Sequence, residues 1–345
     1  MNKSDQLRVA VFGAGSIGCY LGGQLALGGA HVTFIGRARF QVDLSKNGLT
    51  LTHFERSKFH VPFERFEFAT DPAALKNADI VLVCVKSQDS ADAAAQILPH
   101  IKPGSMIISF QNGVSNPEVL SEGLPGHVVL GGVVPFNVTG TGPGRFHCGT
   151  EGDLVVQDHA DPRLASLKIA FEACGQALIL AADINAVQWG KLLVNLNNAL
   201  NALSGGTLHE GLSQRAYRMS LALMIEEGLT VLNGAGIKPA QFGKASIHQT
   251  LKILRLPNFA FKIIMALVLK IDRKARSSML DDLEMGRGPE VEYLQGEIVR
   301  LAGKTDQSAP INQAVMTAVL SAFEAGRSPK LSGDEIFALC ARTHP

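Results

Sequence analysis

Apolar and polar positions form two different patterns along the chain, and the patterns meet near Ala182 and Asp183. Before this point, short apolar runs that end in turn residues predict the strands of a parallel sheet. After it, apolar positions recur with helical spacing to the end of the chain, interrupted by glycine and proline. The pattern therefore predicts an N-terminal α/β domain over residues 1–183 and an all-helical domain over residues 184–345.

The clearest strand predictions are continuous apolar runs at residues 78–86, 106–113 and 128–134. Runs without polar alternation are typical of parallel strands that are buried on both faces. Residues 48–68 alternate instead, which predicts a small hairpin inserted into the sheet. A glycine-rich turn at residues 140–144 and the apolar run at 153–157 predict antiparallel additions.

The first apolar run passes directly into a GxGxxG turn, followed by a helical pattern and a second strand that begins at His31. Glycines at these spacings allow a tight turn, close approach of a pyrophosphate and close helix packing, and the helix amides then face the phosphates. A purely structural glycine-rich turn is the alternative. The strand and helix context favours a Rossmann-type dinucleotide site, formed by Gly13, Ala14, Gly15, Ser16, Ile17 and Gly18.

The end of the second strand indicates which dinucleotide binds. NAD sites usually carry Asp or Glu here to hold the ribose 2′-hydroxyl, whereas this chain has Arg37 and then Arg39. No carboxylate occurs between Gly18 and Asp43, so a 2′-phosphate meets cations alone. We therefore expect NADP(H), and the alternative is two solvated loop arginines.

Lys86 and Asn112 lie at the carboxyl ends of two of the predicted apolar runs. Ligands of open α/β sheets bind outside the carboxyl ends of the strands, so we expect both side chains to face the cofactor. A solvated lysine at a strand end and an ordinary turn asparagine are the alternatives.

The first helix of the second domain is unusually polar for an apolar segment, with four asparagines between residues 189 and 201. Lys191, Asn195 and Asn198 fall at i, i+4 and i+7, which predicts one stripe on a helix. Burial near a cleft would lower the pKa of Lys191 and favour proton donation near neutral pH. A solvated polar face is the alternative.

A second polar cluster covers residues 276–282, and Gly286 to Pro289 separates it from Glu290. Proline is favoured at the first position of a helix, which predicts Glu290 in the first turn of the next helix. The helix dipole stabilises a carboxylate there. Local pattern alone thus makes Glu290 a helix-start stabiliser and Ser278 an ordinary helix serine.

In combination, these motifs resemble the ketopantoate reductase (2-dehydropantoate 2-reductase) family over nearly the whole chain. The resemblance implies NADPH-dependent reduction of ketopantoate to pantoate, on a pathway to pantothenate and coenzyme A. The motifs that carry it are the GxGxxG turn, Arg37, Val85-Lys86, Gln111-Asn112-Gly113, Trp189-Gly-Lys191-Leu-Leu-Val-Asn195, Ser277-Ser278-Met-Leu-Asp-Asp and Glu290-Val-Glu-Tyr.

The resemblance also implies roles for individual residues. Lys191 matches the general acid, and Glu290 matches a residue that orients or tunes it. Substrate binding is implied for Asn195, Asn198, Ser278 and Asn112, and proximity to the cofactor for Lys86 and Asn112.

This chain departs from the family at one point. Relatives usually have two asparagines four apart in this helix, the second followed by Pro-Leu, whereas here the second asparagine is either Asn198 or replaced by Ala199. A different branched 2-keto acid therefore stays open as the substrate. A related 3-hydroxyacid or polyol-phosphate dehydrogenase and a non-catalytic NADP(H) sensor also stay open as functions.

Composition argues against several function classes. A net charge of +1 gives no surplus for nucleic acid or an anionic membrane. The start of the chain lacks a secretory pattern, and the apolar stretch at residues 259–271 is too short to span a bilayer. We expect a cytoplasmic protein with a small-molecule substrate.

The five cysteines form no CxxC pair, and the histidines form no metal motif, so we expect reduced thiols and no metal. Apolar residues 260–269 could contribute to a homodimer interface, although an apolar helix is more often core.

Overall fold

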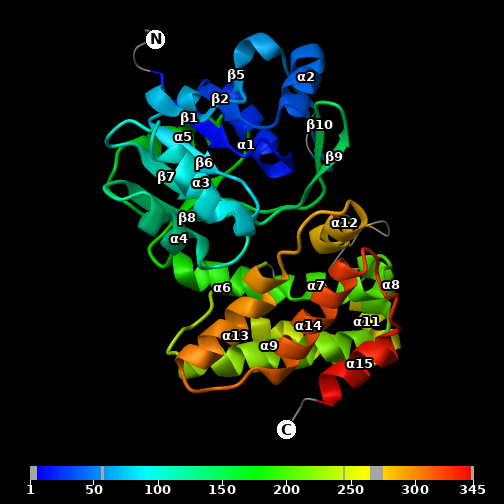
Figure 1. The fold of residues 1–345 in the computed structure, drawn as a ribbon. Coiled ribbons are helices and arrows are strands. Elements are labelled where there is room, and N and C mark those ends of the chain that lie inside the picture. The colour runs from blue at the N-terminus through cyan, green and yellow to red at the C-terminus, as the bar shows by residue number, and fades with distance from the viewer. Residues whose placement is uncertain (1–5, 56–57, 244, 265–274, 343–345) are drawn as a thin grey trace. The chain divides into compact units, whose positions relative to one another are not determined.

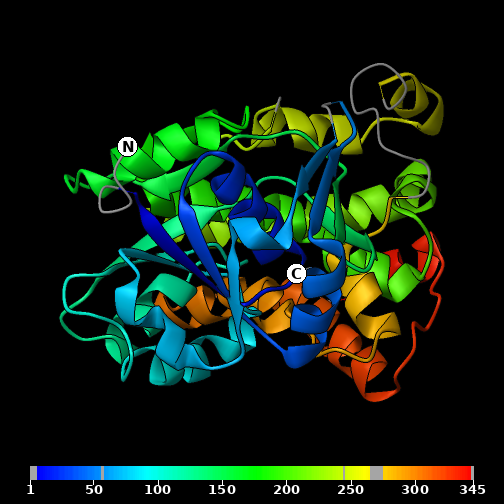
Figure 2. The same ribbon diagram turned by 90° about the horizontal axis from the view of Figure 1, so that it is seen from above.

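The computed structural model describes residues 6–55, 58–243, 245–264 and 275–342. The chain divides into two compact units, residues 1–185 and 186–345. The first unit contains a largely parallel sheet with helices, and the second is helical in its described residues (Figures 1 and 2). The predicted fold class is confirmed.

An eight-stranded sheet forms the centre of the first unit, in the strand order β12-β11-β8-β7-β6-β1-β2-β5. Neighbouring strands are parallel, except that β8 and β11 are antiparallel. The strands are β1 (Arg8–Phe12), β2 (His31–Ile35), β5 (Glu67–Ala69), β6 (Ile80–Val83), β7 (Met106–Ser109), β8 (Val128–Val133), β11 (Leu154–Gln157) and β12 (Leu178–Ala181).

Both faces of this sheet are buried, which explains the continuous apolar runs. In β1, Val9 and Val11 belong to one core, whereas Ala10 and Phe12 belong to another, because successive side chains point to opposite faces. Residues of α1 and α5 contribute to the first core, and residues of α3 and α4 to the second. The helices of this unit are α1 (Ser16–Leu27), α2 (Ala38–Asn47), α3 (Ser90–Ile97), α4 (Asn116–Gly123) and α5 (Arg163–Glu172).

The order of the strands reverses beside β1. From β1 the chain proceeds to β2 and β5 on one side, and it returns to β6 on the other. The connections leaving β1 and β6 therefore separate to opposite sides, and in open α/β sheets ligands bind at the carboxyl ends of strands beside such a reversal. This edge of the sheet carries all the predicted cofactor residues.

A second sheet of four strands, in the order β4-β3-β10-β9, belongs to the same unit. It joins β3 (Leu49–His53) and β4 (Phe59–Val61) to β9 (Val138–Gly142) and β10 (Arg145–Cys148). The predicted hairpin exists, since β3 and β4 are antiparallel, but its insertion into the main sheet is wrong. The hairpin pairs instead with β10, whose sequence lies about ninety residues further on. The antiparallel additions predicted at β9, β10 and β11 are confirmed.

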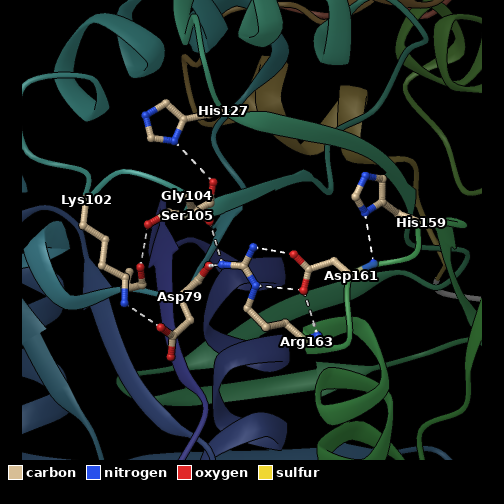
Figure 3. A network of polar contacts seen from close by, with 9 residues as sticks. Asp79, Lys102, Gly104, Ser105, His127, His159, Asp161 and Arg163 are labelled. Carbon is tan, nitrogen blue, oxygen red and sulfur yellow. Dashed lines mark hydrogen bonds and ion pairs between the residues drawn. The ribbon is translucent and has the colours of Figure 1, made fainter.

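At the opposite, amino-terminal edge of the main sheet, Arg163 ties α5 to the loops before β6 and β7 (Figure 3). Its guanidinium donates to the backbone oxygens of Asp79 at 2.9 Å and Gly104 at 2.8 Å. Its Nε donates to Asp161 at 2.9 Å, and this bond holds the pKa of the Asp161 carboxyl down at about 2. These contacts are structural and lie away from the carboxyl edge.

The second unit packs its helices around the long helix α9 (Arg215–Gly234), which contacts α10, α13, α14 and α15. No helix among the described residues is long and apolar enough to cross a membrane. Residues 265–271 of the predicted apolar stretch lie outside the described residues. The other helices are α6 (Ile184–Asn195), α7 (Asn197–Ser204), α8 (Leu208–Ser213), α10 (Ile247–Leu254), α11 (Asn258–Ile264), α12 (Ser278–Glu284), α13 (Gln295–Lys304), α14 (Pro310–Glu324) and α15 (Gly333–Ala341).

Candidate active site

The glycine-rich turn between β1 and α1 packs directly against the ends of two neighbouring strands. The backbone amides of Gly13 and Ala14 donate to the carbonyl of Ile35, at 3.0 and 3.2 Å. Gly13 has φ of +103°, and a Cβ there would lie 2.7 Å from the backbone nitrogen of Val85. Only glycine fits this position, which brings the turn against the chain that leads to Lys86.

Gly15 needs a different explanation. A Cβ at Gly18 would lie 2.2 Å from the carbonyl oxygen of Gly13, so the packing of α1 itself requires that glycine. At Gly15, φ is −85° and a Cβ would meet nothing within 4 Å. The fold therefore tolerates a side chain at residue 15, and the open space above the turn suits a group that approaches the backbone closely.

The first turn of α1 follows, with Ser16 and Ile17 at its start, and contains no acidic residue. Its cap, Gly15, makes no side-chain hydrogen bond to these amides. The amide dipoles at this end favour an anion such as a pyrophosphate. The residues present thus fit a dinucleotide.

Arg37 caps α2 immediately after β2 and is exposed, as is Arg39. Gly36 brings this corner close to the glycine-rich turn, because a Cβ there would lie 2.7 Å from the Cβ of Ala14. The Arg39 guanidinium lies 5.0 Å above the Phe40 ring. Neither arginine forms an ion pair within the described part of the chain.

Lys86 and Asn112 leave β6 and β7 at the same edge as the glycine-rich turn. Lys86 caps the short 3-10 helix Ser87–Asp89, and both residues are partly buried. Because β1, β6 and β7 are adjacent and parallel, their carboxyl ends lie side by side. The structure thus brings the predicted cofactor residues of the first unit together.

In the second unit, the predicted polar stripe is interrupted. One continuous helix over residues 189–201 is wrong, because α6 ends at Asn195 and α7 begins at Asn197. Leu196 keeps helical angles, with φ −55° and ψ −27°, but its carbonyl accepts a hydrogen bond at 3.0 Å from the side chain of Gln295. The side-chain amide of Gln295 thus competes with the backbone amides of the helix for the Leu196 carbonyl.

The interruption separates Lys191 and Asn195 on α6 from Asn198 on α7. All three residues are partly buried. Ala199 is fully buried, so of the two candidates for the second asparagine position only Asn198 retains accessible surface.

Lys191 has the electrostatics of a proton donor. Desolvation lowers its pKa from 10.5 to about 8, and the charge of Glu290 acts in the opposite direction. Glu290 is 5% exposed. An ammonium group with a pKa of about 8, on which the charge of a buried carboxylate acts, suits general acid chemistry.

The predicted position of Glu290 in the first turn of a helix is wrong. It precedes the 3-10 turn Val291–Tyr293, and α13 begins only at Gln295. Its burial is explained by neighbours in the chain, since Val291 and Leu294 are both core residues. Charge interaction with Lys191 thus replaces the expected role at a helix start.

Ser278 begins α12 and is partly buried. Its neighbour Ser277 caps the helix by accepting from the amide of Leu280 at 3.2 Å, and its hydroxyl donates to the carbonyl of Asn198 at 3.3 Å. The predicted substrate residues Asn198 and Ser278 are therefore held near each other through Ser277.

Sequence reasoning missed Asn201, Ser277 and Gln295 as supports of this region. The side chain of Asn201, which is fully buried, accepts from the backbone amide of Ser277 at 2.9 Å. The only available signal was the excess of asparagines in an apolar helix, and nothing local distinguishes Gln295.

The five cysteines are free thiols, and burial raises the pKa of Cys84 and Cys340 to about 12.

Comparison with known proteins decides the family. The model of the family described as Ketopantoate reductase PanE/ApbA matches residues 9–161, and its C-terminal counterpart matches residues 183–322. The chain belongs to the ketopantoate reductase family. It is therefore an oxidoreductase, and the predicted resemblance is confirmed.

Two 2-dehydropantoate 2-reductases illustrate the similarity. The protein of Halobacterium salinarum is 30% identical over 88% of this chain and 95% of its own length. That of Pyrococcus horikoshii is 25% identical over 89% of this chain and 94% of its own length.

Comparison with solved structures also finds ketopantoate reductases. A ketopantoate reductase of this family from Ralstonia eutropha has a TM-score of 0.77 and 27% identity, over 93% of this chain and 99% of its own. A D-mandelate dehydrogenase has the same TM-score at 17% identity, over 93% of this chain and 99% of its own, so the fold extends to that enzyme.

Proposed function

We propose that this protein reduces ketopantoate to pantoate with NADPH, in a pathway to pantothenate and coenzyme A. The electrostatics of Lys191 are the observation that carries the proposal: burial lowers its pKa to about 8, and the charge of the buried Glu290 acts on it. The names of the relatives support the substrate.

The first unit would hold the cofactor. The amides at the start of α1 would contact the pyrophosphate above Gly15, and Arg37 with Arg39 would bind the 2′-phosphate. Lys86 and Asn112 would contact the part of the cofactor that reaches the ends of β6 and β7. When bound, NADPH supplies the hydride that reduces the keto carbon.

Lys191 would supply the proton. As the keto carbon gains the hydride, negative charge develops on the carbonyl oxygen, and the ammonium first stabilises this charge and then transfers a proton to it. The product is a 2-hydroxy acid, and Lys191 is left neutral until solvent reprotonates it. The charge of Glu290 opposes the desolvation and raises the pKa of Lys191.

Asn195, Asn198, Ser278 and Asn112 would bind the substrate through its carboxylate and hydroxyl groups. The departure from the family pattern in this segment gives a specific reason to test a second substrate, because either Asn198 is displaced by one residue or Ala199 stands at the position of the second asparagine. A larger branched 2-keto acid is the second candidate.

We also propose that the protein forms a homodimer. A structurally similar ketopantoate reductase of Staphylococcus aureus, 20% identical, is described as dimeric. The predicted interface includes residues 265–269, which lie outside the described residues.

Oxidation of NADPH in the presence of a panel of 2-keto acids tests the proposed activity. The panel should include ketopantoate, its analogue without the terminal hydroxyl, and larger branched acids. A site that hydrogen-bonds this hydroxyl should reject the analogue by a factor of about 10⁴ or more, whereas an apolar pocket would discriminate only about 10–200-fold. Tight binding of NADPH without turnover of any acid would instead favour a non-catalytic sensor.

A further inference from the structure

A buried group of polar side chains joins the turns that follow β6 and β7. We name Ser87, Ser90, Ser109, Gln111 and Asn116 the strand-end network. Each of these residues is at most 6% exposed. None of them is among the residues assigned above to the cofactor, the substrate or proton transfer.

The backbone carbonyl of Asn112 receives two donors from this network. The hydroxyl of Ser87 donates to it at 2.8 Å, and the side-chain amide of Asn116 donates to it as well. The second hydrogen of the Asn116 amide points to the hydroxyl of Ser87 at 3.3 Å. Because Ser87 follows Lys86 directly, this triangle links the Lys86 turn to the Asn112 turn.

The remaining members fix the orientation of these donors. The hydroxyl of Ser90 lies 2.8 Å from the side-chain oxygen of Asn116 and accepts from the amide of Gln111 at 2.8 Å. The side-chain oxygen of Gln111 in turn accepts from Ser109 at 2.9 Å. A buried network in which the polar atoms are paired rigidifies its surroundings.

Folding alone does not explain this network, because apolar residues would join two parallel strand ends without desolvating five polar side chains. The same two strands are also linked at their other ends, where the buried Ser105 donates to the carbonyl of Ala78 at 2.7 Å. Arg163, which donates to the carbonyls of Asp79 and Gly104, and the ion pair of Lys102 with Asp79 join the same two loops. The network of five buried, uncharged side chains lies instead at the edge that carries the glycine-rich turn.

We propose that Ser87 and Asn116 are positioning residues that hold the Asn112 turn in the conformation that binds NADPH. They act by clamping the Asn112 carbonyl from two sides. This inference rests on the proposed cofactor site at the carboxyl ends of β1, β6 and β7.

Ser105→Ala is a matched control for Ser87→Ala. Each substitution removes the hydroxyl of a serine that is 1% exposed, and with it a hydrogen bond of 2.7 or 2.8 Å between the connections of β6 and β7. The two variants should lose similar thermal stability. They differ in the edge of the sheet at which the bond is lost.

The test measures the Kd of NADPH by fluorescence titration and the melting temperature of each variant. We expect Ser87→Ala and Asn116→Ala to raise the Kd about tenfold, the factor that one hydrogen bond represents. Ser105→Ala should leave the Kd within about twofold of the wild type. Ser90→Ala, which keeps both donors to Asn112 but frees the Asn116 amide, should give an intermediate Kd, and it carries the test if Asn116→Ala does not fold.

Equal values of Kd for Ser87→Ala, Asn116→Ala and Ser105→Ala would overturn the inference and leave the network a structural feature. The outcome is independent of the substrate. A wild-type protein that binds NADPH but reduces no ketopantoate would refute the proposed activity, while the comparison of Kd values would still decide the role of the network.

Discussion

The side-chain oxygen of Asn201 accepts a hydrogen bond at 2.9 Å from the backbone amide of Ser277. The amide of the same side chain donates to the carbonyl of Gly206, also at 2.9 Å. Asn201 thus uses both ends of its side chain to connect α7, the turn after it and the start of α12. Ser278 is the first residue of α12 and directly follows Ser277, so this contact helps to fix its position.

Replacing Asn201 by alanine should therefore weaken substrate binding and leave cofactor binding intact. The buried backbone amide of Ser277 and the partly buried carbonyl of Gly206 lose their partner, which should lower the free energy of unfolding by about 1–3 kcal/mol. We expect the KM for ketopantoate to rise about tenfold while the Kd of NADPH is unchanged.

Asn197→Ala is the matched control on the same helix, since the side chain of Asn197 accepts at 2.9 Å from Tyr217, which belongs to α9 rather than to α12. It should lower the melting temperature without raising the KM. An equal rise of the KM in both variants would show that Asn201 acts only through general stability.

The pKa of Lys191 predicts the pH dependence of turnover. A general acid must be protonated, so kcat for reduction should fall as pH rises through about 8. Glu290→Gln removes the charge that raises this pKa, so the midpoint should move to lower pH. A profile of kcat against pH for both proteins checks the direction of the shift. An unchanged midpoint in the variant would show that the charge of Glu290 does not raise the pKa of Lys191.

Arg37 should determine the choice between NADPH and NADH. Arg37→Ala should weaken NADPH binding by about 1.5–3 kcal/mol, the range for a charged hydrogen-bond partner, and leave NADH binding almost unchanged. Lys46→Ala removes the same charge from the last turn of the same helix and should alter neither affinity. Equal affinity of the wild type for both cofactors would contradict the role given to Arg37.

Asp161 should stabilise the first unit in a pH-dependent way. Its carboxyl has a pKa of about 2 in the folded state against an ordinary value of 3.8, mainly because of the hydrogen bond from Arg163. The stabilisation is complete above the ordinary value and is lost as pH falls toward 2. Asp161→Asn should thus lower the free energy of unfolding by about 2 kcal/mol at pH 7, and denaturant titrations should find this difference shrinking in acid.

Local pattern was sufficient to predict the glycine-rich turn and the strands β1, β2, β6, β7 and β8, but not β12. Continuous apolar runs report burial on both faces of a sheet, and Gly13 occupies a backbone conformation that only glycine adopts easily. The order of these elements also predicted that Lys86 and Asn112 leave the sheet at one edge.

Long-range contacts could not be predicted in this way. At the interruption, the carbonyl of Leu196 accepts a hydrogen bond from Gln295, almost a hundred residues further along the chain, and no local feature of either residue predicts this contact. Glu290 was placed at a helix start because Pro289 favours one, but the chain forms a 3-10 turn before α13 begins. The two strand-end donors to Asn112 are equally inconspicuous in sequence.

The most direct test of the central claim follows the hydride itself. NADPH that carries deuterium at the transferred position should be incubated with ketopantoate and the wild-type protein, and the pantoate analysed by mass spectrometry. The account predicts one deuterium at the new C2–H bond of pantoate, and a rate of formation about 10²–10⁴-fold lower with Lys191→Ala. Pantoate without deuterium, no pantoate from the wild type, or an unchanged rate in a folded Lys191→Ala variant would contradict it.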